Sequence, residues 1–470
     1  MLRNPLTRLH IGLNRFGISV MLLLLLLALP LTARAQGTYS TAGYSLAGGR
    51  GTLLRDIDAA LVNPALLGLP GRSSFSIRLF TGTVHVSQNI MSIGRWNKWQ
   101  GSFIDEKEKS RFLNSLGKTC HIDVLSEISI LGVQVGPFAL GFYNVIDAEV
   151  RIPADLFELV LVGNELDRRY RFGDLGAGIE AVSVIHASYA FKLPIAEESY
   201  LPMTIVPVRE LYGGVGLKYY IGHQYAGIDE GIIDLTFTRA GLFGNADYTY
   251  QSAGIPGEWV DDDSDDPEVI ADSTFSTTSG GGIGLDLGVA GIINDQLSFH
   301  LGLLNLSPGI KWTGSTYEVH FNASADTISV GTFLELDEEA EETDLDSLTS
   351  YDADVTKIGS FRTPVPVLLR MGATYRWKRV ALSAELEQAL SSGLGHNLVP
   401  RLALGVEYRP IRVFPLRAGI SLGGRLGLVG AIGLGLDLRA FVWELGIGNT
   451  GLTPGGLKGL GVSTGLKISF

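Results

Sequence analysis

A serine between two glycines is the most enzyme-like motif in the chain. Gly461-Val-Ser463-Thr-Gly465 has the spacing of a nucleophile elbow, in which a hydrolase serine attacks a carbonyl carbon. That chemistry requires a strand-to-helix turn, followed later in the chain by an acidic residue and a histidine. Only five residues follow Gly465, and none of them is acidic or histidine. The motif is therefore predicted to lie within a strand, and no enzymatic activity is expected.

Histidines and acidic clusters are the remaining candidates for chemistry. The histidines are scattered, with no serine or acid at a repeated spacing, so they predict neither a catalytic site nor a metal site. Acidic clusters occupy 261–268 and 335–346. Their carboxylates are suitable ligands for divalent cations, but neither cluster has the spacing and central glycine of an EF-hand loop. Solvated loops are the favoured interpretation, calcium binding stays open as the alternative, and no cofactor is predicted.

The element that carries Ser463 is indicated by strict alternation over the last twelve residues, 459–470. Small and polar residues, among them Lys467, occupy one face of the expected strand. The opposite face carries Leu460, Val462, Thr464, Leu466, Ile468 and Phe470. This pattern is typical of the closing strand of an outer-membrane β-barrel, which has lipid outside and water inside. On this segment alone, a strand of a soluble sandwich is the alternative.

Comparable alternation recurs in six further segments, which makes the barrel interpretation the stronger one. The segments are 211–220, 283–289, 297–303, 380–387, 401–409 and 434–439. In each of them one face is aliphatic, whereas the other is rich in glycine and carries nearly all of the charges. The charged residues predicted to face the lumen are Lys218, Glu385, Glu387, Glu407, Arg409, Asp437, Arg439 and Lys467. They would either brace a narrow barrel as inter-strand pairs or line a polar conduit.

The N-terminus predicts export. Arginines precede the apolar run 18–31, and Ala33-Arg34-Ala35 then forms a small-x-small cleavage site. Residues 1–35 are therefore predicted to be a cleavable signal peptide. No later run reaches the roughly 18 apolar residues that a transmembrane helix requires. Even so, the mean hydropathy is +0.23, which many two-faced strands would explain.

Composition narrows the class further. The 470 residues include 60 glycines and one cysteine, Cys120, so no internal disulfide framework is possible. The formal net charge is −12, and removing the four arginines of the signal peptide leaves about −16. A chain this acidic is not expected to bind nucleic acid.

A parse of the remaining chain gives an all-β, transmembrane antiparallel β-barrel over 73–470, with about 14 strands and a range of 12–18. Short turns are predicted at Gly136-Pro137, Gly244-Asn245, Asn294-Asp295 and Trp377-Lys378. Stretches 231–254 and 310–336 are either barrel strands or protruding hairpins. One short loop helix is predicted between Pro153 and Asn164, because an acidic residue opens the segment and Gly-Asn ends it.

The glycine-rich segment before the first strand carries a family resemblance. An acidic pair, Asp56 and Asp58, precedes Asn63-Pro64-Ala65-Leu66. This arrangement resembles the N-terminal hatch of FadL-type outer-membrane proteins, which transport long-chain fatty acids and hydrocarbons. The resemblance implies a 14-stranded barrel, a plug over 36–72 that contains Asn63, Pro64 and Ala65, and hydrophobic ligands that leave the lumen sideways.

Other stretches are closer to a second branch of exported bacterial barrels, which is also similar to the PorV-like accessory barrels of type IX secretion. They are 153–164, 213–222, 281–290 and 415–424. We therefore expect an outer-membrane barrel, surrounded by lipid, for passive transport of a small hydrophobic molecule gated by its plug. The alternative is a non-conducting barrel that docks or assembles secreted proteins.

Overall fold

The computed structural model describes residues 40–71, 73–194, 208–239, 241–254, 277–328, 349–438, 440–452 and 456–470. Within these ranges, 19 strands form one antiparallel sheet. The strands are β1 (Phe75–Gln88), β2 (Thr119–Val135), β3 (Phe138–Pro153), β4 (Arg169–Leu193), β5 (Glu210–Phe237), β6 (Leu242–Ala253), β7 (Gly280–Ile292), β8 (Leu297–Leu306), β9 (Ile310–Trp312), β10 (Tyr317–Ile328), β11 (Thr349–Lys357), β12 (Phe361–Thr363), β13 (Leu368–Trp377), β14 (Val380–Ala389), β15 (Arg401–Ile411), β16 (Phe414–Gly423), β17 (Val429–Leu438), β18 (Phe441–Thr450) and β19 (Gly459–Ser469).

The pairing of these strands closes the sheet into a barrel. Each strand pairs with the next around the ring β1–β5, β7, β8 and β13–β19, and β19 then pairs with β1 from Ser76↔Ser469 to Ser87↔Gly459. Among the described residues, 16 strands are ten residues or longer, which lies within the predicted range. Fourteen of them form the ring, and the other two are β6 and β10. The predicted all-β antiparallel barrel is confirmed.

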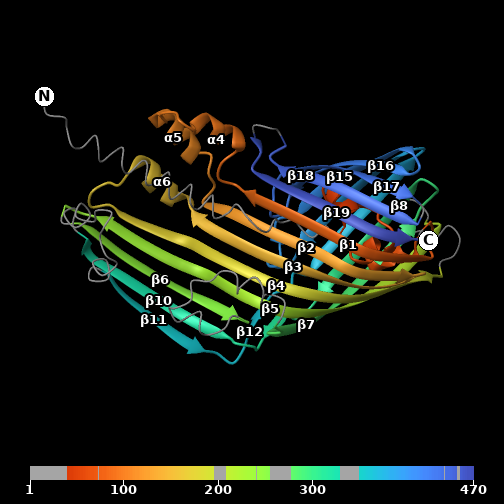
Figure 1. Ribbon diagram of the computed structural model, residues 1–470, viewed down its shortest axis with the longest axis horizontal. Helices are drawn as coiled ribbons and strands as arrows, with labels where there is room; N and C mark the ends of the chain where they lie inside the picture. Colours follow the sequence, from red (N-terminus) through yellow and green to blue (C-terminus); the bar gives the residue numbers. More distant parts are fainter. Residues whose placement is uncertain are drawn as a thin grey trace.

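The strands β6, β10 and β11 extend the barrel wall beyond the ring. Residues 210–222 of β5 pair with β7, whereas residues 225–237 of the same strand pair with β6. β6 then pairs with β10, and β10 with β11 (Figure 1). The sequence assigned stretches 231–254 and 310–336 either to the barrel or to hairpins. Their described residues contribute mainly to this extension, and 329–336 lie outside the described residues.

The two ends of the ring differ in their connections. We call the end that carries turns 136–137, 293–296, 378–379 and 412–413 the turn rim, and the opposite end the loop rim. The predicted turn at Gly244-Asn245 is wrong, because both residues pair within β6. The chain reverses instead at Thr238–Gly241, where the Thr238 amide donates to the Gly241 carbonyl.

Helices lie inside the ring and at the loop rim (Figure 1). They are α2 (Thr41–Ser45), α3 (Asp56–Ala60), the 3-10 helix η1 (Pro64–Gly68), α4 (Ile93–Trp99), α5 (Glu106–Leu113) and α6 (Ala154–Val162). α6 confirms the predicted loop helix, whereas α4 and α5 were not predicted. Among the described residues, no helix is long and apolar enough to cross a membrane.

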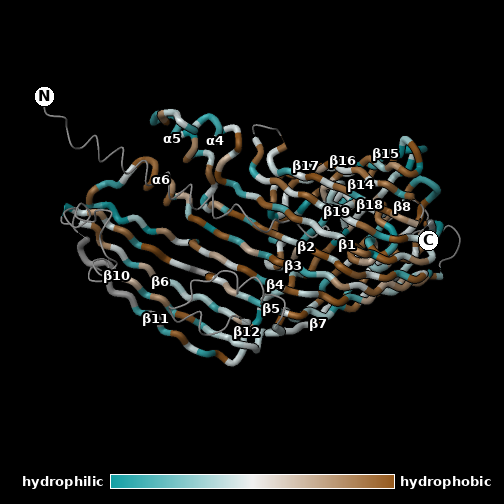
Figure 2. Tube along the Cα trace, viewed as in Figure 1, coloured by the Kyte–Doolittle hydropathy of each residue, from teal (hydrophilic) through white to brown (hydrophobic). Residues whose placement is uncertain are grey.

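Hydrophobic and hydrophilic residues alternate along the ring strands (Figure 2), and buried and exposed side chains alternate with them, as the sequence predicts. Leu217, Ile283 and Ile432 are each more than 60% exposed on the outer face. On the inner face of β19, Ser463 is fully buried, so the enzyme-like motif lies within a regular strand. A continuous aliphatic exterior on a closed barrel has the surface that a bilayer requires.

Candidate functional site

The lumen is occupied by residues 40–71, coloured red to orange in Figure 1, which we call the plug. All three of its short helices contact ring strands, and nearly all of its side chains are buried. The sequence predicted a plug over 36–72; residues 36–39 and Arg72 lie outside the described residues. The predicted signal peptide, 1–35, also lies outside them.

A buried ion-pair cluster joins the plug to β13, β14 and β15. Arg50 Nε donates to Glu385 Oε1 at 3.0 Å, and Arg50 Nη2 donates to Glu387 Oε2 at 3.3 Å. The Gly51 amide also donates to Glu385 Oε2 at 3.1 Å. On the wall, Arg370 lies 2.5 Å and Arg401 3.2 Å from the same Glu387 oxygen. Two predicted lumen carboxylates therefore bind the plug instead of lining an open path.

A second ion-pair cluster is centred on Asp58 of α3. It accepts from Arg78 Nη2 of β1 at 2.5 Å and from Lys467 Nζ of β19 at 2.7 Å. Burial alone would raise the pKa of Asp58, but the two cations outweigh it and lower this pKa to about 2. The carboxylate therefore stays ionised and bonds the plug to the seam where the barrel closes.

This pKa predicts how plug docking depends on pH. Because the pKa of docked Asp58 lies below its ordinary 3.8, the pairing stabilises the docked plug fully above about pH 4 and is lost as the pH falls toward 2. Bilayer conductance should therefore be constant from pH 7 to pH 4.5, and Asp58→Asn should raise it at every pH. A rise in wild-type conductance between pH 7 and pH 5 would contradict this assignment.

Asn63 holds the turn between α3 and η1 against β7 and β8. Its side-chain Nδ2 donates to the Leu301 carbonyl at 2.9 Å, and its Oδ1 accepts from the Ala65 amide at 2.9 Å. Pro64 is the first residue of η1. Two wall glycines make room for this turn. A Cβ on Gly288 would lie 1.8 Å from Asn63 Oδ1, and one on Gly214 would lie 2.1 Å from the Ala65 nitrogen. The predicted plug residues thus dock on a glycine-lined wall.

The remaining predicted lumen charges are paired as well. Lys218 lies 2.8 Å from Asp286 on the neighbouring β7, and both are buried. Arg409 bridges Glu407 at 2.8 Å and Asp437 at 3.4 Å. Arg439 lies outside the described residues. Of the two sequence-based interpretations, the placement of these side chains favours bracing of the barrel over an open polar conduit.

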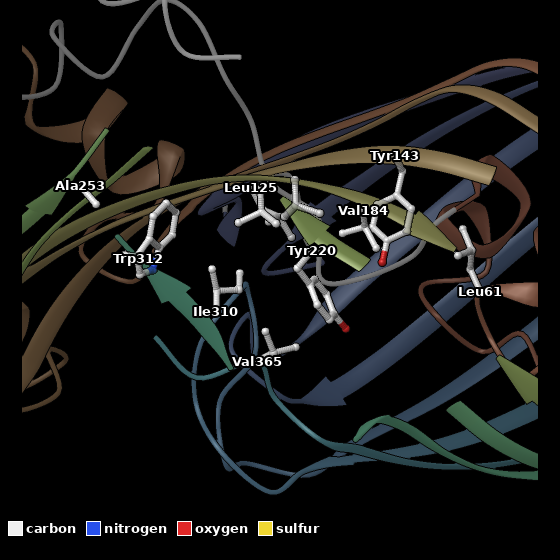
Figure 3. Packing of buried hydrophobic residues seen from close by; sticks show 11 residues of the cluster. Leu61, Leu125, Tyr143, Val184, Tyr220, Ala253, Ile310, Trp312 and Val365 are labelled. Carbon is white, nitrogen blue, oxygen red and sulfur yellow. The ribbon is translucent and has the colours of Figure 1, made fainter. Parts of the chain in front are cut away.

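An apolar cluster, which the sequence analysis missed, lies inside the barrel on the loop-rim side of the plug (Figure 3). Its members come from the plug, from β2–β6 and β9, and from the segment before β13; they are Leu61, Leu125, Tyr143, Val145, Val182, Val184, Tyr220, Ala253, Ile310, Trp312 and Val365. Trp312 is fully buried, and its indole nitrogen donates to Thr363 Oγ1 at 3.0 Å. Alternation alone marks these side chains as inward, but not as neighbours. Leu61 brings the plug into direct contact with this apolar interior.

Neither metal nor cofactor chemistry gains support from the geometry. In the part of the chain that the structure describes, His, Cys, Asp and Glu do not gather in groups of three or more able to hold a metal ion. The acidic clusters at 261–268 and 335–346 lie outside the described residues. Solvated loops therefore stay the favoured prediction there, with calcium binding as the alternative.

Comparison with known proteins concerns the family and the fold. The profile of a family described as "Family of unknown function (DUF5723)" matches residues 59–443. No curated protein matches the sequence. Similar solved structures include the Ralstonia pickettii toluene transporter TbuX, with 10% identity, 93% of this chain and 99% of that chain covered, and a TM-score of 0.44. A Pseudomonas aeruginosa FadL homologue shows 11% identity, 94% and 100% coverage, and a TM-score of 0.46. The Pseudomonas putida toluene transporter TodX shows 11% identity, 94% and 99% coverage, and a TM-score of 0.44. These are FadL-type barrels, the group that the N-terminal segment resembles.

Proposed function

The chain belongs to the family of unknown function DUF5723, and we propose that it is an outer-membrane barrel through which a small hydrophobic molecule passes when the plug moves. The observation that carries the proposal is the apolar cluster in contact with Leu61 of the plug. A hydrophobic solute that enters from the loop rim would meet this apolar interior before it meets the plug. The aliphatic outer face of the ring supports placement in a bilayer, and the predicted signal peptide supports export.

The plug is the gate in this proposal. It is held by polar contacts to β1, β7, β8, β13, β14 and β19, and by apolar packing of its buried side chains against β3, β4 and β7. Paired charges of this kind are strong only while both partners are present and dehydrated. A displacement that admits water would weaken several of them together, which suits a two-position element.

Removal of the plug tests the function. Purified mature protein in proteoliposomes should admit a small aromatic dye slowly, and deletion of residues 40–71 should raise both dye entry and bilayer conductance. The barrel of the deletion variant is verified by its heat-modifiable migration and its β-sheet circular dichroism. A correctly folded deletion variant that stays silent, or a wild-type barrel that co-purifies with a secreted protein and never conducts, favours the docking alternative and overturns transport.

A polar group in the apolar cluster tests the route. Val184→Asn places an amide among buried apolar side chains, where an amide without a hydrogen-bond partner costs about 1–3 kcal/mol. We expect entry of the aromatic dye to fall by about tenfold, while the conductance of the plug-deleted barrel changes little. The matched control is Val429→Asn, since Val429 is a buried valine on β17 that lies outside the cluster. Equal losses of dye entry in the two variants would show that the cluster is not on the route.

A further inference from the structure

A large cavity opens at the turn rim between the plug and the wall formed by β13–β19. Its volume is about 1060 Å³, close to the upper end of the range for small-molecule sites. The plug lines it with Leu53–Asp56 and Asp58, and the wall with the turns after β13 and β15. We call this cavity the vestibule. It lies at the opposite end of the plug from the apolar cluster, and the two share no lining residue.

The vestibule is basic although the chain as a whole carries a net charge of −12. Among the described residues that line it, eight are cationic and five are acidic. The cations are Arg55, Arg376, Lys378, Arg379, Arg409, Arg412, Arg417 and Lys467, and the acids are Asp56, Asp58, Glu407, Asp437 and Glu444. The lining of the vestibule therefore has a positive net charge, whereas the net charge of the whole chain is negative.

The protein's own cations and hydrogen-bond donors already bind all five acids. Asp58 is bound by Arg78 and Lys467, and Asp56 accepts from the Ser73 amide and the Ser469 hydroxyl. The other three acids lie in a network with two arginines. Arg417 contacts Glu407 and Glu444 at 2.8 Å each, and Arg409 contacts Glu407 and Asp437. Four of the five acids are therefore already paired with cations of the protein, whereas Asp56 is bonded to two neutral donors.

Five cations are left, and none of them forms an ion pair with a described residue: Arg55, Arg376, Lys378, Arg379 and Arg412. The contacts found for the three arginines at the plug and the first wall turn are to backbone oxygens. Arg376 donates to the Thr52 carbonyl at 3.1 Å, Arg379 donates to the Pro410 carbonyl at 2.9 Å, and Arg55 donates to the Gly71 carbonyl. A guanidinium carries five N–H donors, so each retains donors for a ligand.

Two of these arginines come from opposite sides of the cavity. Arg55 belongs to the plug and Arg376 to β13, and both also line a neighbouring cavity of about 230 Å³. Guanidinium groups bind carboxylate and phosphate oxygens through paired hydrogen bonds. We propose that the vestibule binds a small polyanion, a molecule with two or more phosphate or carboxylate groups, at Arg55, Arg376, Lys378, Arg379 and Arg412.

Calorimetry on the purified, detergent-solubilised mature protein tests the proposal. The probes are tripolyphosphate and citrate, which distinguish phosphate from carboxylate ligands. At least one probe should bind, with an affinity that falls as salt is raised. The triple variant K378Q/R379Q/R412Q should bind about tenfold more weakly, since charge-assisted hydrogen bonds are lost. All three side chains are exposed and lie at turns, so the variant is expected to fold.

The matched control is K98Q/K107Q/R111Q, which removes the same amount of charge from α4 and α5 at the loop rim. Its affinity should match wild type within about twofold. An equal loss in the control variant would reduce the binding to general electrostatic attraction and overturn the site. The site would also be overturned if neither tripolyphosphate nor citrate bound at 1 mM. Tighter binding of a hexaglutamate peptide than of both probes would assign the vestibule to an acidic protein segment instead.

Discussion

Methionine in place of Arg50 is expected to release the plug and open the barrel to ions. The Arg50 side chain is fully buried and contacts both Glu385 and Glu387. Without Arg50, Glu385 loses its nearest cation inside a dehydrated interior. Removing one partner of a buried ion pair typically costs about 3–5 kcal/mol. Because Arg50 lies on the plug and Glu385 on the wall, most of that cost falls on plug docking.

Two readouts check this result. Conductance in planar bilayers should rise, and chymotrypsin should cleave after Tyr44, which is only 4% exposed while the plug is docked. Adding Glu385→Gln to the methionine variant should restore part of the docking, because the uncompensated charge is then removed. The matched control is Arg425→Met. Arg425 pairs with Asp123, Asp147 and Glu149 of the wall, so this change should weaken the barrel without exposing Tyr44.

If the methionine variant stays closed and resists chymotrypsin while the Arg425 control behaves as expected, the Arg50 cluster braces the wall and does not hold the plug. An increase in chymotrypsin cleavage without an increase in conductance would show that the plug leaves its site but that the lumen stays blocked. Either outcome would contradict the gating role proposed for residues 40–71.

Local alternation is enough to predict which way the strand side chains face. On β19 it places Val462 outside and Ser463 inside, and the register of β19 with both neighbours agrees. The reason is physical, since the side-chain period of a strand is two and each face of a barrel meets a different medium. The same pattern predicted that Glu385 and Glu387 face inward.

The partners of the inward side chains could not be predicted from the sequence, because they depend on contacts between residues far apart in the chain. Arg50 and Glu385 are separated by 335 residues, and nothing near either residue indicates the other. The apolar cluster is a similar case, since its members come from six strands, the plug and the segment before β13. Turn chemistry also misled at Gly244-Asn245. This dipeptide favours a turn, but its pairing with Leu235 and Asp234 of β5 keeps it in a strand.

Helices α4 and α5 were missed although their sequence contains the usual signals. Asp105 caps α5 by accepting from the Glu108 amide, and Glu106 and Arg111 lie at the ends that suit their charges. Both helices are short and lie in the connection between β1 and β2. A search of this connection for capping residues would have found α5.

Alanine in place of Gly214 is expected to displace the plug without removing any charge. A Cβ at this position would lie 2.1 Å from the Ala65 nitrogen and 2.4 Å from the Pro64 carbonyl carbon, both of which are backbone atoms. Side-chain rotation cannot relieve such an overlap, so the turn at Asn63 must move away from β5. Overpacking of this kind costs about 1–3 kcal/mol, and here the displacement would also strain the bond from Asn63 to the Leu301 carbonyl.

Trypsin cleavage after Arg50, which is fully buried in the docked plug, measures the displacement directly, and bilayer conductance should rise with it. Gly281→Ala is the matched control, because a Cβ on this β7 glycine would be no closer than 3.5 Å to its neighbours. The control should behave as wild type in both assays. Protection of Arg50 in the Gly214 variant, together with a folded barrel, would show that β5 yields before the plug does. The barrel wall at β5 would then deform more easily than the plug moves. This result would contradict the proposal that the plug moves as a gate inside a rigid barrel.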